Sequence, residues 1–155
     1  MPSSPSPTPA VRGLVLFRLG RNWLGVDIQD IQRVVPLDYV TWLSMESGFI
    51  IGTVGLHGRL LPVIDLAAIL GQGSDRRPAQ GMVLISRAGD TEIGMIADEL
   101  DDAFIIPESR IQEPGRELLS RPVIGICRCG NRDVRIIDPS RIVEVLRERQ
   151  EILSA

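Results

Sequence analysis

Hydrophobic and polar residues alternate in short runs along most of the chain, and turn residues separate these runs. The stretch "VRGLVLFRLGRNWLGVDI" holds two such runs, residues 14–19 and 23–28, joined by the turn letters "GRN", and it predicts a β-hairpin. The stretches "IQRVVPL" and "FIIGTVGLHGRLLPVID" predict further strands. In the second of these, Gly52, Gly55 and Gly58 mark bends or bulges of the kind that curl a small sheet.

The alternation changes to a helical pattern at "DLAAILG", and the whole sequence of patterns then occurs a second time. The stretches "MVLISRAGDTEIGMIADEL" and "ICRCGNRDVRIIDPSRI" repeat the order of strand, turn and strand. Gly94 follows Gly25 at an offset of 94 − 25 = 69, and Asp138 follows Asp65 at 138 − 65 = 73. Both aspartates stand where a helix N-cap is expected, and Pro139 occupies the favoured first helical position.

Two units of about 65 residues are each too small for a large core of their own. We therefore expect an all-β protein with two small antiparallel barrels that share a hydrophobic core, short helices at the barrel ends and an amphipathic C-terminal helix. The expected segments are a disordered Pro/Ser-rich leader at 1–11 and a single domain at 12–150, divided into lobe one at 12–71, a linker at 72–80, lobe two at 81–138 and the helix at 139–153.

The composition excludes several classes of function. A net charge of −3 and an aromatic content of 4% argue against nucleic-acid binding. All 17 basic residues are arginine, so no lysine is present for Schiff-base or P-loop chemistry. No apolar run approaches the roughly 20 residues that span a bilayer, and the stretch "MPSSPSPTPA" lacks the basic and apolar regions of a signal peptide. We expect a soluble cytoplasmic protein without direct membrane insertion.

The candidate catalytic residues are few. The only histidine, His57, precedes Asp65 by eight positions, but the equivalent Asp138 has no histidine before it, so the duplicated aspartate is better explained as a helix cap. The C-x-C spacing of Cys127 and Cys129 is too tight for an easy disulfide, and no second ligand pair for zinc exists. The simpler interpretation is that the two cysteines act as small apolar side chains on one face of a strand. We expect no enzyme activity, no metal and no cofactor.

Four stretches, in order, resemble the CheW-type chemotaxis coupling proteins: "FRLGRNWLGVDIQDIQRVVP", "GTVGLHGRLLPVIDLAAILG", "IGMIADELDDAFIIPESRI" and "RIIDPSRI". The match runs from about Leu14 to Leu146, and "G-x-L-P-V-I-D-L" is its most specific element. The resemblance implies two five-stranded SH3-like barrels around a shared core. It also implies a non-enzymatic adaptor that couples methyl-accepting chemoreceptors to a CheA-type histidine kinase. Barrel-to-barrel contact would join the kinase regulatory domain, a groove between the lobes would hold the helical receptor tip, and receptor arrays would recruit the protein to the inner membrane.

The sequence departs from the family pattern at two positions that the resemblance assigns to partner contacts. His57 stands where the family usually has arginine, and Arg33 stands where it usually has glutamate, which reverses a charge. Such a reversal costs affinity for the usual partner and can select another. An alternative function is therefore a scaffold or inhibitor of the same fold that is adapted to a non-standard partner, and an alternative role for His57 is a solvent-facing turn residue. The predicted partner surface consists of Ile31, Arg33, Val35, Leu56, His57 and Arg59.

Overall fold

The computed structural model describes residues 10–44, 48–72, 78, 80–115 and 122–152. In chain order the strands are β1 (Val11–Leu19), β2 (Asn22–Asp27), β3 (Ile31–Pro36), β4 (Val40–Trp42), β5 (Ile50–Leu56), β6 (Arg59–Ile64), β7 (Met82–Ala88), β8 (Thr91–Ala97), β9 (Glu99–Pro107), β10 (Val123–Cys129) and β11 (Arg132–Ile137). The helices are α1 (Leu66–Ile69) and α2 (Pro139–Glu148), and 3₁₀ turns occur at η1 (Ile28–Asp30), η2 (Leu37–Tyr39) and η3 (Glu108–Arg110).

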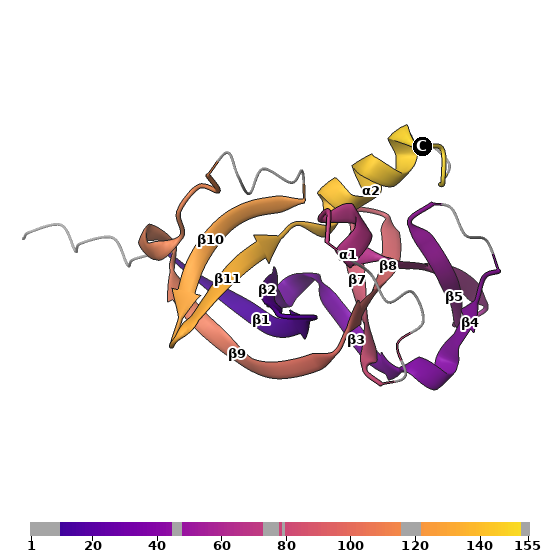
Figure 1. Ribbon diagram of the computed structural model, residues 1–155, viewed down its shortest axis with the longest axis horizontal. Coiled ribbons are helices and arrows are strands. Elements are labelled where there is room, and N and C mark those ends of the chain that lie inside the picture. The colour runs from indigo at the N-terminus through magenta and orange to yellow at the C-terminus, as the bar shows by residue number, and fades with distance from the viewer. Residues whose placement is uncertain (1–9, 45–47, 73–77, 79, 116–121, 153–155) are drawn as a thin grey trace, which may run out of the picture.

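The strands form two sheets, each curled into a half-barrel (Figure 1). The first sheet has the order β10-β11-β2-β1-β9, and we call it lobe A. The second has the order β3-β7-β8-β6-β5-β4, and we call it lobe B. Helix α2 lies over the junction between the two lobes (Figure 1). The expected all-β, two-lobed architecture is confirmed.

The sheets do not follow the expected division into residues 12–71 and 81–138. Lobe A combines β1 and β2 from the first half of the chain with β9, β10 and β11 from the second. Lobe B combines β3 to β6 from the first half with β7 and β8 from the second. The chain crosses between lobes at η1 and at Asp98, and the parallel pairs β2–β11 and β6–β8 join the halves within each lobe. Each lobe is therefore a composite of both halves.

The predicted internal repeat is present in the pairing of the strands. Gly25 of β2 lies opposite Ile136 of β11, and Gly94 of β8 lies opposite Val63 of β6, so the two repeated glycines occupy matching places in the two lobes. One difference gives lobe B six strands instead of five. Strand β4 pairs fully with β5, whereas the corresponding segment of lobe A makes only an isolated bridge, Gln112 to Ile126.

A shared core joins the two lobes. It contains buried side chains from both sheets and from both helices: Phe17, Leu24, Val26, Ile64, Leu66, Leu84, Ala88, Ile93, Met95, Ala97, Val123, Ile137, Ile142, Val143 and Leu146. Each lobe also has a smaller core of its own, centred on Val54, Leu61 and Ile85 in lobe B and on Leu14, Leu16 and Ile136 in lobe A. The expectation of a shared hydrophobic core is confirmed.

The predicted helix caps are confirmed. The Asp65 carboxylate accepts the N–H of Ala68 at the start of α1, and the Asp138 carboxylate accepts the N–H of Ser140 at the start of α2. Helix α2 ends at Glu148, earlier than the expected residue 153, which lies outside the described residues. It ends because Gln150 adopts a positive φ of 59° and the N–H of Glu151 donates back to the Leu146 carbonyl, a Schellman arrangement.

The expected leader and linker fall largely on residues that the structure does not describe. Of the leader at 1–11, residues 1–9 lie outside the described residues, and Val11 already begins β1. Of the linker at 72–80, residues 73–77 and 79 lie outside them as well. These two segments therefore remain expectations.

Candidate functional site

The turn between β5 and β6 presents His57 to solvent. His57 and Gly58 are its two central residues, with φ values of 52° and 75°, and Leu56 pairs with Arg59 across the turn. Positive φ at both central residues defines a type I′ turn, which matches the right-handed twist of the flanking strands. Histidine is one of the few side chains that tolerate this conformation, and glycine adopts it freely. The expected exposure of His57 at a turn is confirmed, and its expected part in a partner surface stays a prediction.

The side chains of Arg33 and His57 meet at this turn although 24 positions separate them. The register of β3 against β7 shifts between Ile31 and Arg33, which marks a bulge at Gln32. Because lobe B curls, the β3 strand approaches the β5–β6 turn, and Arg33 Nη2 lies 3.5 Å from His57 Nε2. The two residues expected to depart from the family pattern are therefore neighbours.

A shallow hollow of about 190 Å³ lies beneath this contact, at the end of lobe B. Its lining comes from five strands and one turn: Gln32, Arg33, Leu56, His57, Arg59, Leu61, Ile85 and Glu92. Leu61 and Ile85 belong to the lobe B core and are buried. Arg59 forms an ion pair with Glu92, whose side chain is largely shielded. We call this the barrel-end hollow.

The structure brings together four of the six residues predicted for the partner surface. Arg33, Leu56, His57 and Arg59 all line the barrel-end hollow. Val35 does not belong to the surface, because its side chain is 3% exposed and lies in the lobe B core; its place in the predicted surface is wrong. Arg33 and Val35 are two positions apart on β3, so their side chains face the same way, which is why both were predicted for one surface. The strand runs from the open end of the lobe into its core, so Val35 is buried. Ile31, the sixth residue, is half-buried against the shared core.

Sequence reasoning did not include Glu92, which completes the hollow. Its carboxylate comes from β8, in the second half of the chain, and neutralises Arg59 from the first half. Glu92 and Trp23 stand at the same offset as Gly94 and Gly25, 92 − 23 = 69, so they occupy matching places in the repeat, but this spacing does not predict that Glu92 pairs with Arg59. In lobe A the guanidinium of Arg132 stacks on the Trp23 ring at 3.8 Å from its centroid and forms an ion pair with Asp101.

A second surface on lobe A exposes apolar side chains. Val11 and Ile105 lie on the outer face of the β1–β9 pair, where Ile105 is opposite Gly13. A Cβ on Gly13 would lie 3.1 Å from Ile28 Cγ2, so Ile28 covers the space that the glycine leaves free. Val11 is 58% exposed, Ile28 is 48% exposed and Ile105 is 77% exposed. These three side chains form a contiguous apolar face beside the crossing between the lobes at η1.

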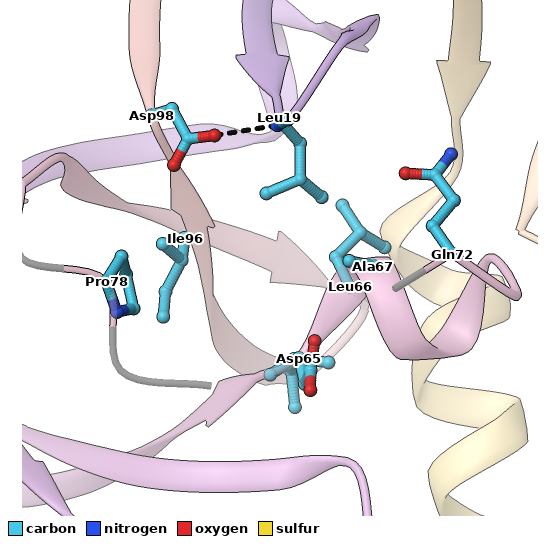
Figure 2. Close-up of a pocket in the computed structure, with 10 residues that line it drawn as sticks. Leu19, Asp65, Leu66, Ala67, Gln72, Pro78, Ile96 and Asp98 are labelled. Carbon is cyan, nitrogen blue, oxygen red and sulfur yellow. Dashed lines mark hydrogen bonds between the residues drawn. The ribbon is translucent and has the colours of Figure 1, made fainter. Parts of the chain in front are cut away.

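A pocket of about 250 Å³ lies at the junction of the lobes and is shown in Figure 2. The β1–β2 turn of lobe A forms part of its wall, and Ile64 to Ala67, Ile96 and Asp98 of lobe B form most of the rest. The Asp98 carboxylate accepts the backbone N–H of Gly20 at 2.7 Å, which ties this turn to the end of β8 (Figure 2). The pocket's two carboxylates, Asp65 and Asp98, thus serve backbone groups of the fold.

The two cysteines lie side by side on β10. Cys127 and Cys129 are both buried in the lobe A core, with their sulfur atoms 3.5 Å apart. Burial and the hydrogen bond between the thiols raise the pKa of Cys127 to about 12, and burial also raises the pKa of Cys129. Thiols in this state are poor nucleophiles, which agrees with two small apolar side chains on one face.

Two absences concern only the residues that the structure describes. Within these residues, no group of three or more His, Cys, Asp or Glu side chains is placed to hold a metal ion. In the same part of the chain, no helix has the length and apolar character needed to cross a bilayer.

The two curled sheets and their shared core define a two-lobed β domain, and comparison with known proteins gives its family. The model of the CheW-like domain matches residues 13–147, so the chain belongs to this family. It is 23% identical to the chemotaxis protein CheW of Thermotoga maritima over 88% of this chain and 90% of the relative. It is 27% identical to protein FrzA of Myxococcus xanthus over 86% of each chain. The crystal structure of the scaffolding protein TtCheW from Thermoanaerobacter tengcongensis superposes with a TM-score of 0.73 and 27% identity, covering 84% of this chain and 89% of that one.

Proposed function

We propose that this protein is a non-enzymatic adaptor that couples chemoreceptors to a CheA-type histidine kinase in a chemosensory pathway. The observation that carries the proposal is the family match over residues 13–147 together with a fold in which both barrels and their shared core are present. Relatives named as chemotaxis and scaffolding proteins support the same role. The proposed location is the cytoplasm, with recruitment to the membrane through the receptors.

The two exposed surfaces suit two partners. The apolar face of Val11, Ile28 and Ile105 supports contact with the helical tip of a receptor, because an amphipathic helix binds by laying apolar side chains against such a face. The barrel-end hollow around Arg33, His57 and Arg59 supports barrel-to-barrel contact with the kinase regulatory domain. Because the shared core lies between these surfaces, a displacement of one lobe can be transmitted to the other through packed side chains.

Binding assays test this proposal directly. The full-length protein is immobilised and incubated with the regulatory domain of the kinase, and separately with a receptor cytoplasmic fragment, both from the same organism. We expect both to bind, and we expect Ile105→Asp to weaken receptor binding while it leaves kinase binding unchanged. Binding of neither partner would contradict the adaptor role.

A second candidate function follows from the Arg33–His57 contact. Because these neighbouring positions both depart from the family pattern, the chain can also serve as a scaffold or inhibitor for a non-standard partner. Kinase activity distinguishes the two functions. An adaptor raises the activity of the receptor-coupled kinase, whereas an inhibitor lowers it when it competes with the usual coupling protein.

A further inference from the structure

The barrel-end hollow carries one positive charge that nothing in the described chain neutralises. Arg59 and Glu92 form an ion pair and cancel each other. Arg33 is exposed, and its hydrogen-bond partner within the described residues is the His57 ring nitrogen at 3.5 Å, not a carboxylate. An arginine side chain carries five N–H donors and is always protonated, so most of its donors face solvent.

From this arrangement we infer that the barrel-end hollow binds an acidic side chain of the partner protein, with Arg33 as the residue that determines its specificity. This inference rests on the proposed adaptor function and names the chemistry of its partner. A carboxylate fits the planar fork of a guanidinium with two parallel hydrogen bonds, the geometry in which arginine recognises anions most strongly.

His57 positions the guanidinium. Its Nε2 atom lies beside Arg33 Nη2 and, when unprotonated, accepts from it, which leaves the opposite edge of the guanidinium free for a partner. The type I′ geometry at His57 and Gly58 fixes the direction in which the imidazole leaves the backbone, which is toward Arg33. His57 therefore acts through Arg33, without contact with the acidic group itself.

The surroundings of the hollow favour a protein partner. Leu56, Leu61 and Ile85 line the hollow together with Arg33, and Leu61 and Ile85 belong to the buried core of lobe B. Apolar side chains of this kind exclude water when a partner docks, and lower local polarity strengthens the pairing between Arg33 and a carboxylate. A basic side chain at the same place in a partner would be repelled. The hollow thus selects partners by the sign of one charge.

Affinity measurements on Arg33 variants test the inference. The full-length protein and its Arg33→Gln and Arg33→Glu variants are titrated with the regulatory domain of the kinase from the same organism. We expect Arg33→Gln to weaken binding by roughly fivefold and Arg33→Glu by about tenfold or more, because the first removes an attraction and the second adds a repulsion. The salt dependence of binding should also become shallower in Arg33→Gln.

Matched variants separate this effect from general changes. Arg21→Glu makes the same change of charge at an exposed turn of lobe A, and we expect it to bind as the wild type does. His57→Asn preserves the turn, since asparagine also tolerates positive φ, and should weaken binding less than Arg33→Glu does. In the partner, one acidic-to-arginine substitution should restore the binding of Arg33→Glu.

The outcomes are distinguishable. If wild type and Arg33→Glu bind the kinase domain equally, or if Arg21→Glu weakens binding as much as Arg33→Glu, the inference is wrong while the adaptor function stands. If inorganic phosphate at millimolar concentration abolishes wild-type binding but no acidic partner residue can be found, the hollow is an anion site and the inference is also wrong. If the wild type binds neither kinase nor receptor, the proposed function fails and this inference fails with it.

Discussion

The shared core makes a quantitative prediction about how the two lobes unfold. Leu146 of α2 is fully buried among residues from both sheets. Its replacement by alanine removes a side chain from the shared core and leaves a cavity, which costs about 3 kcal/mol. For a domain of this size about 3 °C of melting temperature is lost per kcal/mol, so we expect Leu146→Ala to lower Tm by roughly 9 °C.

The two tryptophans allow each lobe to be followed separately. Trp23 packs against the lobe A core and Trp42 against the lobe B core, and the chain contains no other tryptophan. In a Trp42→Phe background fluorescence reports lobe A, and in a Trp23→Phe background it reports lobe B. We expect Leu146→Ala to lower both transitions equally, because α2 packs against the core that both lobes share.

Leu61→Ala is the matched control, since Leu61 is buried in the core of lobe B alone. It should lower Tm by a similar amount, and again both reporters should follow a single transition if the composite lobes cannot fold separately. Calorimetry on the same variants checks for a second peak. A shift in one reporter with the other unchanged would show that the lobes unfold independently and would refute the reasoning about the shared core.

Three further predictions concern single sites. Burial, followed by the nearby Asp27 and Asp138 charges, raises the pKa of Asp30. The folded state therefore binds the Asp30 proton more tightly than the unfolded state does, and the protein loses stability as pH rises above the ordinary value of 3.8. Asp30→Asn should therefore have a higher Tm than wild type at pH 7 and an equal one near pH 3; a lower Tm at pH 7 would contradict this. Gly94→Ala should destabilise the fold by about 1–3 kcal/mol in urea titrations, because its Cβ would lie 2.7 Å from the Val83 side chain on β7. The same change at Gly25, the matching glycine of the repeat, should cost less, because the nearest atom there is at 3.1 Å. Since the raised pKa of about 12 keeps Cys127 a thiol at pH 8, iodoacetamide should label neither cysteine in the native protein and both in guanidinium; rapid native labelling would show that the β10 site opens.

Much of the local structure follows from the sequence for identifiable reasons. Alternating apolar residues around "GRN", "HG" and "GN" specify hairpins, because the period of side chains along a strand is two and these residues suit tight turns. Asp65 and Asp138 were predictable as caps since their side chains satisfy N–H groups in the next turn of chain. These features depend on residues within a few positions of one another.

The candidate site was predictable only in part. Leu56, His57 and Arg59 were found together because the resemblance assigns one short stretch of the sequence to partner contacts, and the structure shows that this stretch is a hairpin. The contact of Arg33 with His57 and the ion pair of Arg59 with Glu92 depend on the closure of lobe B, which places β3, β6 and β8 around one end. Whether a residue on β3 faces the open end or the core also depends on this closure.

The sequence by itself determined that the chain contains two copies of one strand pattern, with a glycine and a capping aspartate at matching places in each copy. Only the tertiary structure decided how the copies combine. The two copies have the same pattern of apolar residues, so strands β1 and β2 could pair with the remaining strands of either copy and bury the same side chains. The pattern therefore does not distinguish pairing within a copy from pairing across copies. The crossings at η1 and Asp98 select pairing across copies, which makes each lobe a product of both halves and puts the shared core between them.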